Sequence, residues 1–267
     1  MIREPAVAGQ FYPGTAVSLK NLIDKLSDKN VERKQTLGIV SPHAGYMYSG
    51  YVAGAVFSRI NLPSTYIIIG PNHTGSGRPF SLMASGSWKT PLGEVDIDEE
   101  LATILINQSR FIQDDLTAHS FEHSVEVQLP FIQFFKADFK FVPIILSCAD
   151  LATYREIGKD IANVIKQLKK DVVIIASSDM THYEPDEVAK AKDAQAIEAI
   201  LELDEEKLLK KINEFDITMC GYAPTAVMLV AVKKLGAKMA ELVKYQTSAD
   251  ASGDHSAVVG YAGIIVS

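Results

Sequence analysis

Short apolar runs rich in β-branched residues alternate along this chain with stretches of helical periodicity. This alternation is typical of βαβ units and of a largely parallel sheet. Runs such as FVPIIL (141–146) and DVVIIA (171–176) are apolar throughout, so helices should cover both faces of the sheet. The pattern therefore predicts an α/β fold, a single three-layer αβα sandwich with a mostly parallel mixed sheet.

The expected elements can be placed by residue number. Strands are predicted at 36–40, 65–69, 79–84, 139–146, 171–176, 240–246 and 257–266. Helices are predicted at 15–28, 49–60, 98–107, 121–135, 151–168, 186–202, 204–213 and 221–234, with Asp150 as a candidate N-cap. Because no linker or internal repeat divides them, we expect one domain over residues 1–267.

Composition and charge exclude several classes of protein. The formal net charge is −7, which argues against binding nucleic acid or an anionic membrane. Cys148 and Cys220 form no disulfide framework or CxxC pair, and the amino terminus lacks the apolar core of a signal peptide. No apolar run approaches the ~18 residues of a membrane span. We therefore expect a cytoplasmic protein.

Three histidines occupy the same kind of position. His43, His73 and His182 each follow a predicted strand within a few residues. The carboxyl ends of parallel strands meet at one edge of an α/β sheet, where ligands and catalytic groups converge. The pattern predicts a metal or acid/base site at this edge.

Each motif also has a plainer interpretation. His43 would serve equally well to cap a loop by hydrogen bonding, and the glycine-bearing loop around His73 is a weaker candidate for binding phosphate. Asp179 lies three residues before His182, and a carboxylate beside an imidazole suits a general base or a metal ligand. The alternative is a helix-capping aspartate with a surface histidine.

Two further segments carry candidate residues. His123 and Glu126 are three residues apart and would share one face of the predicted helix 121–135, although such pairs are more often exposed hydrogen-bonded pairs. Cys220 is either a small core residue or a thiolate near a helix amino terminus. The remaining histidines, 119 and 255, are expected in loops.

Together these segments resemble the Memo family over nearly the whole chain. The matching pieces are AVAGQFYPG (6–14), SPHAGYMYSG (41–50), GPNHTG (70–75), TPLG (90–93), EHSVEVQLPF (122–131), SSDMTHY (177–183), MCGYAP (219–224) and SAVVGYAG (256–263). That family is similar in fold to the LigB-type class III extradiol dioxygenases, which hold iron(II) with two histidines and a glutamate. The resemblance therefore implies a LigB-dioxygenase-like fold.

The resemblance also implies roles for individual residues. His43 and His73 would be metal ligands, Cys220 would take the third ligand position, and His182 would act as acid/base. From their own motifs, and not from the resemblance, Asp179, His123 and Glu126 are expected to be further catalytic or supporting residues. A thiolate in place of the dioxygenase carboxylate also suits copper or zinc, so dioxygenase activity does not transfer directly. The expected cofactor is one metal ion, with iron(II) or copper preferred to zinc.

The expected function is a metal-dependent redox enzyme that acts on a small-molecule substrate. Two alternatives stay open, a zinc-dependent hydrolase and a non-catalytic module that binds a peptide or small ligand on the same fold. The family resemblance further implies a pathway link to a radical SAM protein and an AMMECR-type protein. Neither nucleic acid nor a membrane is expected as a partner.

Overall fold

A nine-stranded mixed sheet forms the centre of the computed structural model, which describes all residues 1–267. The strand order is β10-β12-β2-β9-β3-β8-β4-β7, and β11 pairs with β12 beside this path. The strands are β2 (Gly38–Ser41), β3 (Thr65–Pro71), β4 (Phe80–Leu82), β7 (Gln113–Asp114), β8 (Lys140–Leu146), β9 (Val172–Ser177), β10 (His182–Glu184), β11 (Ala240–Thr247) and β12 (Val258–Val266).

The four central strands, β2, β9, β3 and β8, are parallel, and antiparallel pairs flank them. Nearly every residue of these four strands is buried, as strands covered on both faces require. The register places Ser41 beside Ser177 at the ends of β2 and β9. This edge is where the chain continues into the predicted site.

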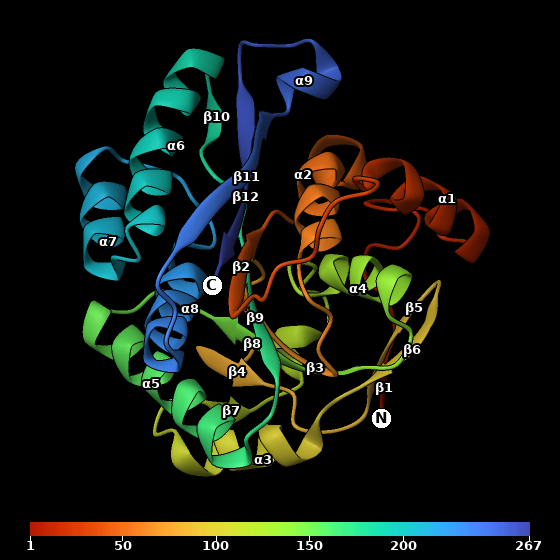
Figure 1. Cartoon of the computed structure of the whole chain (residues 1–267), viewed down its shortest axis with the longest axis vertical. Coiled ribbons are helices and arrows are strands. Elements are labelled where there is room, and N and C mark those ends of the chain that lie inside the picture. The colour runs from red at the N-terminus through yellow and green to blue at the C-terminus, as the bar shows by residue number, and fades with distance from the viewer.

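Helices cover both faces of the sheet (Figure 1). One layer contains α1 (Ala16–Leu26), α2 (Tyr46–Arg59) and α4 (Leu129–Phe135). The other contains α5 (Leu151–Leu168), α6 (Asp186–Leu201), α7 (Glu205–Glu214) and α8 (Tyr222–Leu235), with α3 (Glu99–Gln108) packed against α5 and β8. The predicted α/β sandwich with a mixed sheet is confirmed.

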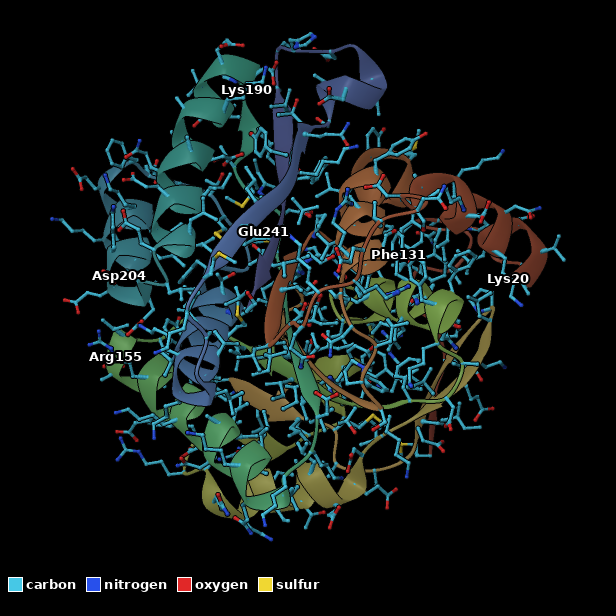
Figure 2. The ribbon with its side chains drawn as sticks, viewed as in Figure 1. Lys20, Phe131, Arg155, Lys190, Asp204 and Glu241 are labelled. Atoms are coloured by element: carbon cyan, nitrogen blue, oxygen red, sulfur yellow. The ribbon has the colours of Figure 1, made fainter.

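The core between these layers is one cluster of 68 buried residues. Phe131 of α4 stacks on Phe57 of α2 with ring centroids 5.5 Å apart. Figure 2 shows Phe131 inside the molecule, while Lys20 and Asp204 lie at its surface.

A small separate sheet joins β1 (Ile2–Arg3), β5 (Ser87–Thr90) and β6 (Gly93–Asp96). No helix is both long and apolar enough to cross a membrane.

Most predicted elements are present near their expected positions, and α5 covers the predicted residues 151–168, with the Asp150 side chain accepting a hydrogen bond from Thr153 N–H. The short strands β1, β5, β6, β7 and β10 and the one-turn helix α9 (Ala249–Ser252) were not predicted. These elements have two to four residues each, which is too few to give a periodic signal.

One predicted helix is wrong in its first half. Instead of a helix over 121–135, the chain forms the 3₁₀ turns η1 (Thr117–His119) and η2 (Glu126–Gln128) before α4 begins at Leu129. The Glu122 carboxylate accepts hydrogen bonds from the backbone N–H groups of His123 and Ser124, at 3.0 and 2.9 Å. Such side-chain to backbone bonds compete with helix formation. His123 and Glu126 consequently do not share a helix face.

Candidate metal site

Three imidazoles converge at the carboxyl edge of the sheet. His43 follows β2, His73 follows β3, and His123 lies in the loop between η1 and η2. Each offers one ring nitrogen, and the three nitrogens lie within 4.8 Å of one another. Ring centroids are 5.1 Å apart for His43 and His73 and 4.7 Å apart for His73 and His123. The group could hold one metal ion.

Hydrogen bonds fix which nitrogen of His43 is free. Its Nδ1 lies 2.9 Å from Ser177 Oγ. The Ser177 hydroxyl donates to the Ser124 carbonyl at 2.6 Å and accepts from Gln128 Nε2 at 2.8 Å, so its remaining lone pair accepts from His43 Nδ1–H. We infer that Nε2 of His43 is unprotonated. That nitrogen carries the lone pair that a metal ligand needs.

His73 is oriented by a carboxylate. Its Nδ1 lies 2.9 Å from Glu122 Oε1, and its backbone N–H donates to Glu122 Oε2 at 2.7 Å. The fully buried Glu122 therefore holds both the ring and the main chain of His73. A carboxylate behind a histidine fixes its tautomer and raises its basicity, which is the usual support of a metal-binding imidazole.

His123 packs between aromatic rings. It stacks on His73 with an interplanar angle of 14°, and the edge of Phe11 meets it at a centroid distance of 4.9 Å. Its Nδ1 is 3.6 Å from Glu122 Oε1, too far for a good hydrogen bond. Packing rather than a hydrogen bond therefore sets the orientation of this ring.

Burial and neighbouring charges set the protonation of this group. Burial lowers the pKa of His43 well below its ordinary value, and burial also lowers the pKa of His123. Burial opposes the charge of His73 as well, but the hydrogen bond and charge of Glu122 outweigh it and raise the pKa of His73. The same contact with His73 outweighs burial at Glu122 and lowers its pKa to about 2. Two of the three imidazoles are thus neutral near pH 7.

Cys220 lies beside the three histidines. Its Sγ is 3.2 Å from His43 Nε2 and accepts a hydrogen bond from the backbone N–H of Asp179 at 3.3 Å. Burial and the charge of Asp179 raise the pKa of the Cys220 thiol, so proximity to the start of α8 does not produce a thiolate. The sulfur adjoins the compact group of three nitrogens without being part of it.

Asp179 and His182 lie near the same group. Asp179 Oδ1 accepts from the backbone N–H of His43 at 2.8 Å, and Oδ2 lies 4.0 Å from His43 Nε2. Burial raises the pKa of Asp179 to about 6 although hydrogen bonds and the charges of His182 and His73 oppose this. His182 Nδ1 lies 2.9 Å from the Thr218 carbonyl, which fixes a proton on Nδ1 and leaves Nε2 as an acceptor.

Glu126 does not face the three imidazoles with a free carboxylate. It is fully buried and accepts hydrogen bonds from Arg3, from the backbone N–H groups of Ala6 and Val7, and from the Tyr12 hydroxyl. All of these partners belong to the amino-terminal segment. The carboxylate therefore has no free lone pair with which to bind a metal ion or accept a substrate proton.

The two histidines expected in loops differ in their surroundings. His119 lies in η1 and is fully buried, and neither ring nitrogen has a hydrogen-bond partner. Burial lowers its pKa to about 3. His255 is exposed on the loop after α9 and lies 2.7 Å from a carboxylate oxygen of Asp186. Both are separate from the candidate site.

Sequence reasoning missed Glu122, Ser177 and Gln128, whose hydrogen bonds orient His73 and His43 or their partners. Glu122 precedes His123 directly, but the predicted helix favoured the spacing to Glu126 instead. A carboxylate adjacent to a histidine in a segment without helical punctuation was the available signal. Ser177 and Gln128 carried none, because only the register of β2 and β9 and the position of η2 bring them to His43.

Comparison with known proteins supports the resemblance to the Memo family that the sequence motifs indicated. The family model described as Memo-like protein matches residues 3–265. A MEMO1 family protein of Methanopyrus kandleri is 46% identical over 279 residues, covering 99% of each chain, and one of Methanosarcina mazei is 46% identical over 267 residues, again covering 99% of each.

A solved structure is similar in fold alone. An uncharacterized protein from Escherichia coli K12 superposes with a TM-score of 0.60 at 14% identity, covering 86% of this chain and 99% of that one. At that identity the match supports the α/β architecture and carries no activity. The family model, in contrast, spans nearly the whole chain. The protein therefore belongs to the Memo family.

Proposed function

We propose that this protein is a metal-dependent redox enzyme that binds one iron(II) or copper ion and acts on a small-molecule substrate. The observation that carries the proposal is the convergence of His43, His73 and His123, each with a ring nitrogen within 4.8 Å of the other two. The donor set fits a transition metal, because imidazole suits iron, copper and zinc. A bound ion would supply Lewis-acid or electron-transfer chemistry at this edge of the sheet.

Cys220 would add a soft donor to the three imidazoles. Its sulfur is 3.2 Å from His43 Nε2, so an ion bound by that nitrogen would have a soft donor beside it. A thiolate beside imidazoles suits copper and iron as well as zinc. Because burial raises the pKa of this thiol, coordination by Cys220 would have to displace its proton, and metal binding through sulfur would weaken in acid.

Two residues would handle protons. His182 holds a proton on Nδ1 against the Thr218 carbonyl, so its Nε2 is the position that would accept a proton from a substrate. Asp179, with its pKa raised to about 6, would change its protonation close to neutral pH. Both are candidates for general acid and base beside the three imidazoles.

Metal analysis of protein purified without oxygen tests the proposal. We expect about one iron or copper ion per chain, and loss of that ion in His43→Ala and His123→Ala. Cys220→Ser should retain the ion with an altered spectrum, and Cys148→Ser, at an exposed cysteine, is the matched control. Wild-type protein that folds normally and takes up no metal under these conditions would overturn the proposal.

A zinc-dependent hydrolase is the second candidate, and the third histidine favours it. Three histidines with an open fourth position are the donor set of a catalytic zinc site, where a carboxylate of raised pKa is a suitable proton acceptor. Asp179 would take that role. Turnover that depends on zinc and is indifferent to oxygen would identify this function.

The cytoplasmic setting and the link to a radical SAM protein and an AMMECR-type protein remain predictions.

A further inference from the structure

The first residues of the chain contact the loop 119–127, which joins η1 to η2 and includes the adjoining residues of both turns. Arg3, in β1, is buried with 4% of its surface exposed. Its Nε donates to the His119 carbonyl at 3.0 Å and its Nη2 to the Glu122 carbonyl at 2.7 Å. The third guanidinium contact is an ion pair with the fully buried Glu126. One side chain thus holds this loop at three positions.

Glu126 fastens the amino-terminal segment in return. Besides Arg3 it accepts hydrogen bonds from the backbone N–H groups of Ala6 and Val7, at 2.7 and 3.1 Å, and from the Tyr12 hydroxyl at 2.5 Å. Four donors use the lone pairs of one carboxylate. The segment 3–12 and the loop are therefore fixed to each other from both sides.

This double attachment reaches the candidate metal site through two contacts. The segment presents Phe11 to the His123 ring, and the Phe11 carbonyl accepts from the backbone N–H of Tyr46 at the start of α2. The carbonyl that Arg3 grips belongs to Glu122, whose carboxylate orients His73. Both the third imidazole and the support of the second therefore lie on the attached loop.

Only arginine has the geometry for these contacts. Its planar fork can donate to two carbonyl groups and a carboxylate at once, and it lies over the Trp88 ring at 4.2 Å. A lysine would keep the charge that Glu126 needs but would reach fewer acceptors. Replacement of Arg3 by lysine therefore keeps the positive charge and removes the planar arrangement of N–H donors.

We propose that Arg3 and Glu126 are positioning residues for the candidate metal site. They act through the loop 119–127, which they hold so that His123 faces His43 and Glu122 faces His73. This assigns a function to the amino-terminal motif AVAGQFYPG, whose backbone and Tyr12 complete the attachment. The inference rests on the metal site of the proposed function but concerns the placement of the imidazoles alone.

Cobalt(II) titration of metal-free protein, followed by its visible absorption, tests the inference. We expect Arg3→Lys to lower cobalt affinity about tenfold or more, in line with losses of supporting contacts at other metal sites. The matched control is Arg155→Lys, which makes the same change at an ion pair with the buried Glu205 between α5 and α7. Its affinity should stay within about twofold of wild type.

A second readout does not involve metal. In protein with labelled histidine rings, the His123 signals, assigned by their absence in His123→Gln, should move in metal-free Arg3→Lys and stay in place in Arg155→Lys. A role confined to stability would lower the unfolding midpoint of Arg3→Lys without moving these signals. Folded Arg3→Lys with unchanged affinity and unchanged His123 signals would overturn the inference.

Tyr12→Phe covers the case in which Arg3→Lys fails to fold. It removes one hydroxyl bond to Glu126 and keeps the ring. We then expect an affinity loss of about threefold with displaced His123 signals, and unchanged values for both would overturn the inference. If wild-type protein binds no metal, the proposed function fails, and the His123 signals alone decide the positioning role.

Discussion

At the scale of single residues, the most specific prediction concerns the carboxylate of Glu122, which lies behind the His73 ring. Glu122→Gln keeps the size of the side chain but removes the charge behind His73. We expect metal affinity at pH 7 to fall about 10- to 100-fold, because supporting carboxylates orient their imidazoles and raise their basicity. The measurement is a cobalt(II) or zinc(II) titration, with Glu94→Gln in the small sheet as the matched control.

The same residue sets a pH dependence. Because Glu122 raises the pKa of His73, protons compete with the metal over a higher pH range than at an ordinary histidine. Metal affinity of the wild type should therefore fall as the pH is lowered from 8 to 6, and in Glu122→Gln the midpoint of that fall should move to lower pH. Equal midpoints in the two proteins would contradict this account.

The buried His119 lies outside the candidate metal site and should make the stability of the protein depend on pH. The pKa of His119 is about 3 in the folded protein, below the value of roughly 6.5 in an unfolded chain. Between these two pH values the imidazole is therefore protonated in the unfolded state and neutral in the folded state. The contribution of His119 to the free energy of unfolding should be constant above about pH 6.5 and should fall by about 1.4 kcal/mol per pH unit as the pH is lowered from 6.5 to 3.

Urea unfolding of metal-free protein at pH 7, 6 and 5 measures this dependence. His119→Leu should lose this part of the pH dependence below pH 6.5, whereas a glutamine at the exposed His255 should keep the wild-type slope. The prediction fails if His119→Leu and wild type have the same slope.

At the scale of elements, the parallel strands were predictable and the loops that complete the site were not. Runs such as Val172–Ser177 are apolar on both faces, and that composition suits only a strand covered by helices on both sides. The loop 119–127 gave the opposite result, because the Glu122 carboxylate accepts hydrogen bonds from the backbone N–H groups of His123 and Ser124 and no α-helix forms there. A pattern of apolar residues carries no information about such side-chain to backbone bonds.

The close packing of strand β3 against the loop 119–127 leads to a further prediction. A Cβ added at Gly70, near the end of β3, would lie 2.2 Å from Ser124 Oγ. Gly70→Ala should therefore displace Ser124 and the adjacent His123, lower the free energy of unfolding by about 1–3 kcal/mol, and weaken metal binding. Urea unfolding and cobalt titration measure the two effects.

The control for this substitution is Gly14→Ala, where the nearest heavy atom to the added Cβ is 3.5 Å away. That variant should stay within about 0.5 kcal/mol of wild type, as surface changes usually do. A Gly70→Ala protein as stable as Gly14→Ala, with full metal affinity, would show that β3 and the loop separate without cost.

At the scale of the whole molecule, the core and the site are built from different parts of the chain. The core is one cluster of 68 buried residues between the sheet and its helices, whereas the site collects residues from loops at one sheet edge. His43 and His73 were predictable, because each follows a strand of the parallel core. His123 lies beside them in a loop that also contacts Phe11 of the amino-terminal segment, and neither of these two stretches of sequence indicates this contact by itself.

This separation predicts how metal should change stability. The three candidate ligand histidines come from three separate loops, so an ion that binds only the folded chain should raise its stability by about 2.7 kcal/mol at a free concentration 100 times the Kd. For a protein of this length that corresponds to a rise in Tm of roughly 5 °C. Thermal unfolding with and without cobalt(II) measures it, and a chelator should reverse it. In His123→Ala the rise should be largely lost while the metal-free Tm stays within a few degrees of wild type, because the core lies elsewhere. An equal rise in wild type and His123→Ala would place the ion at a different site.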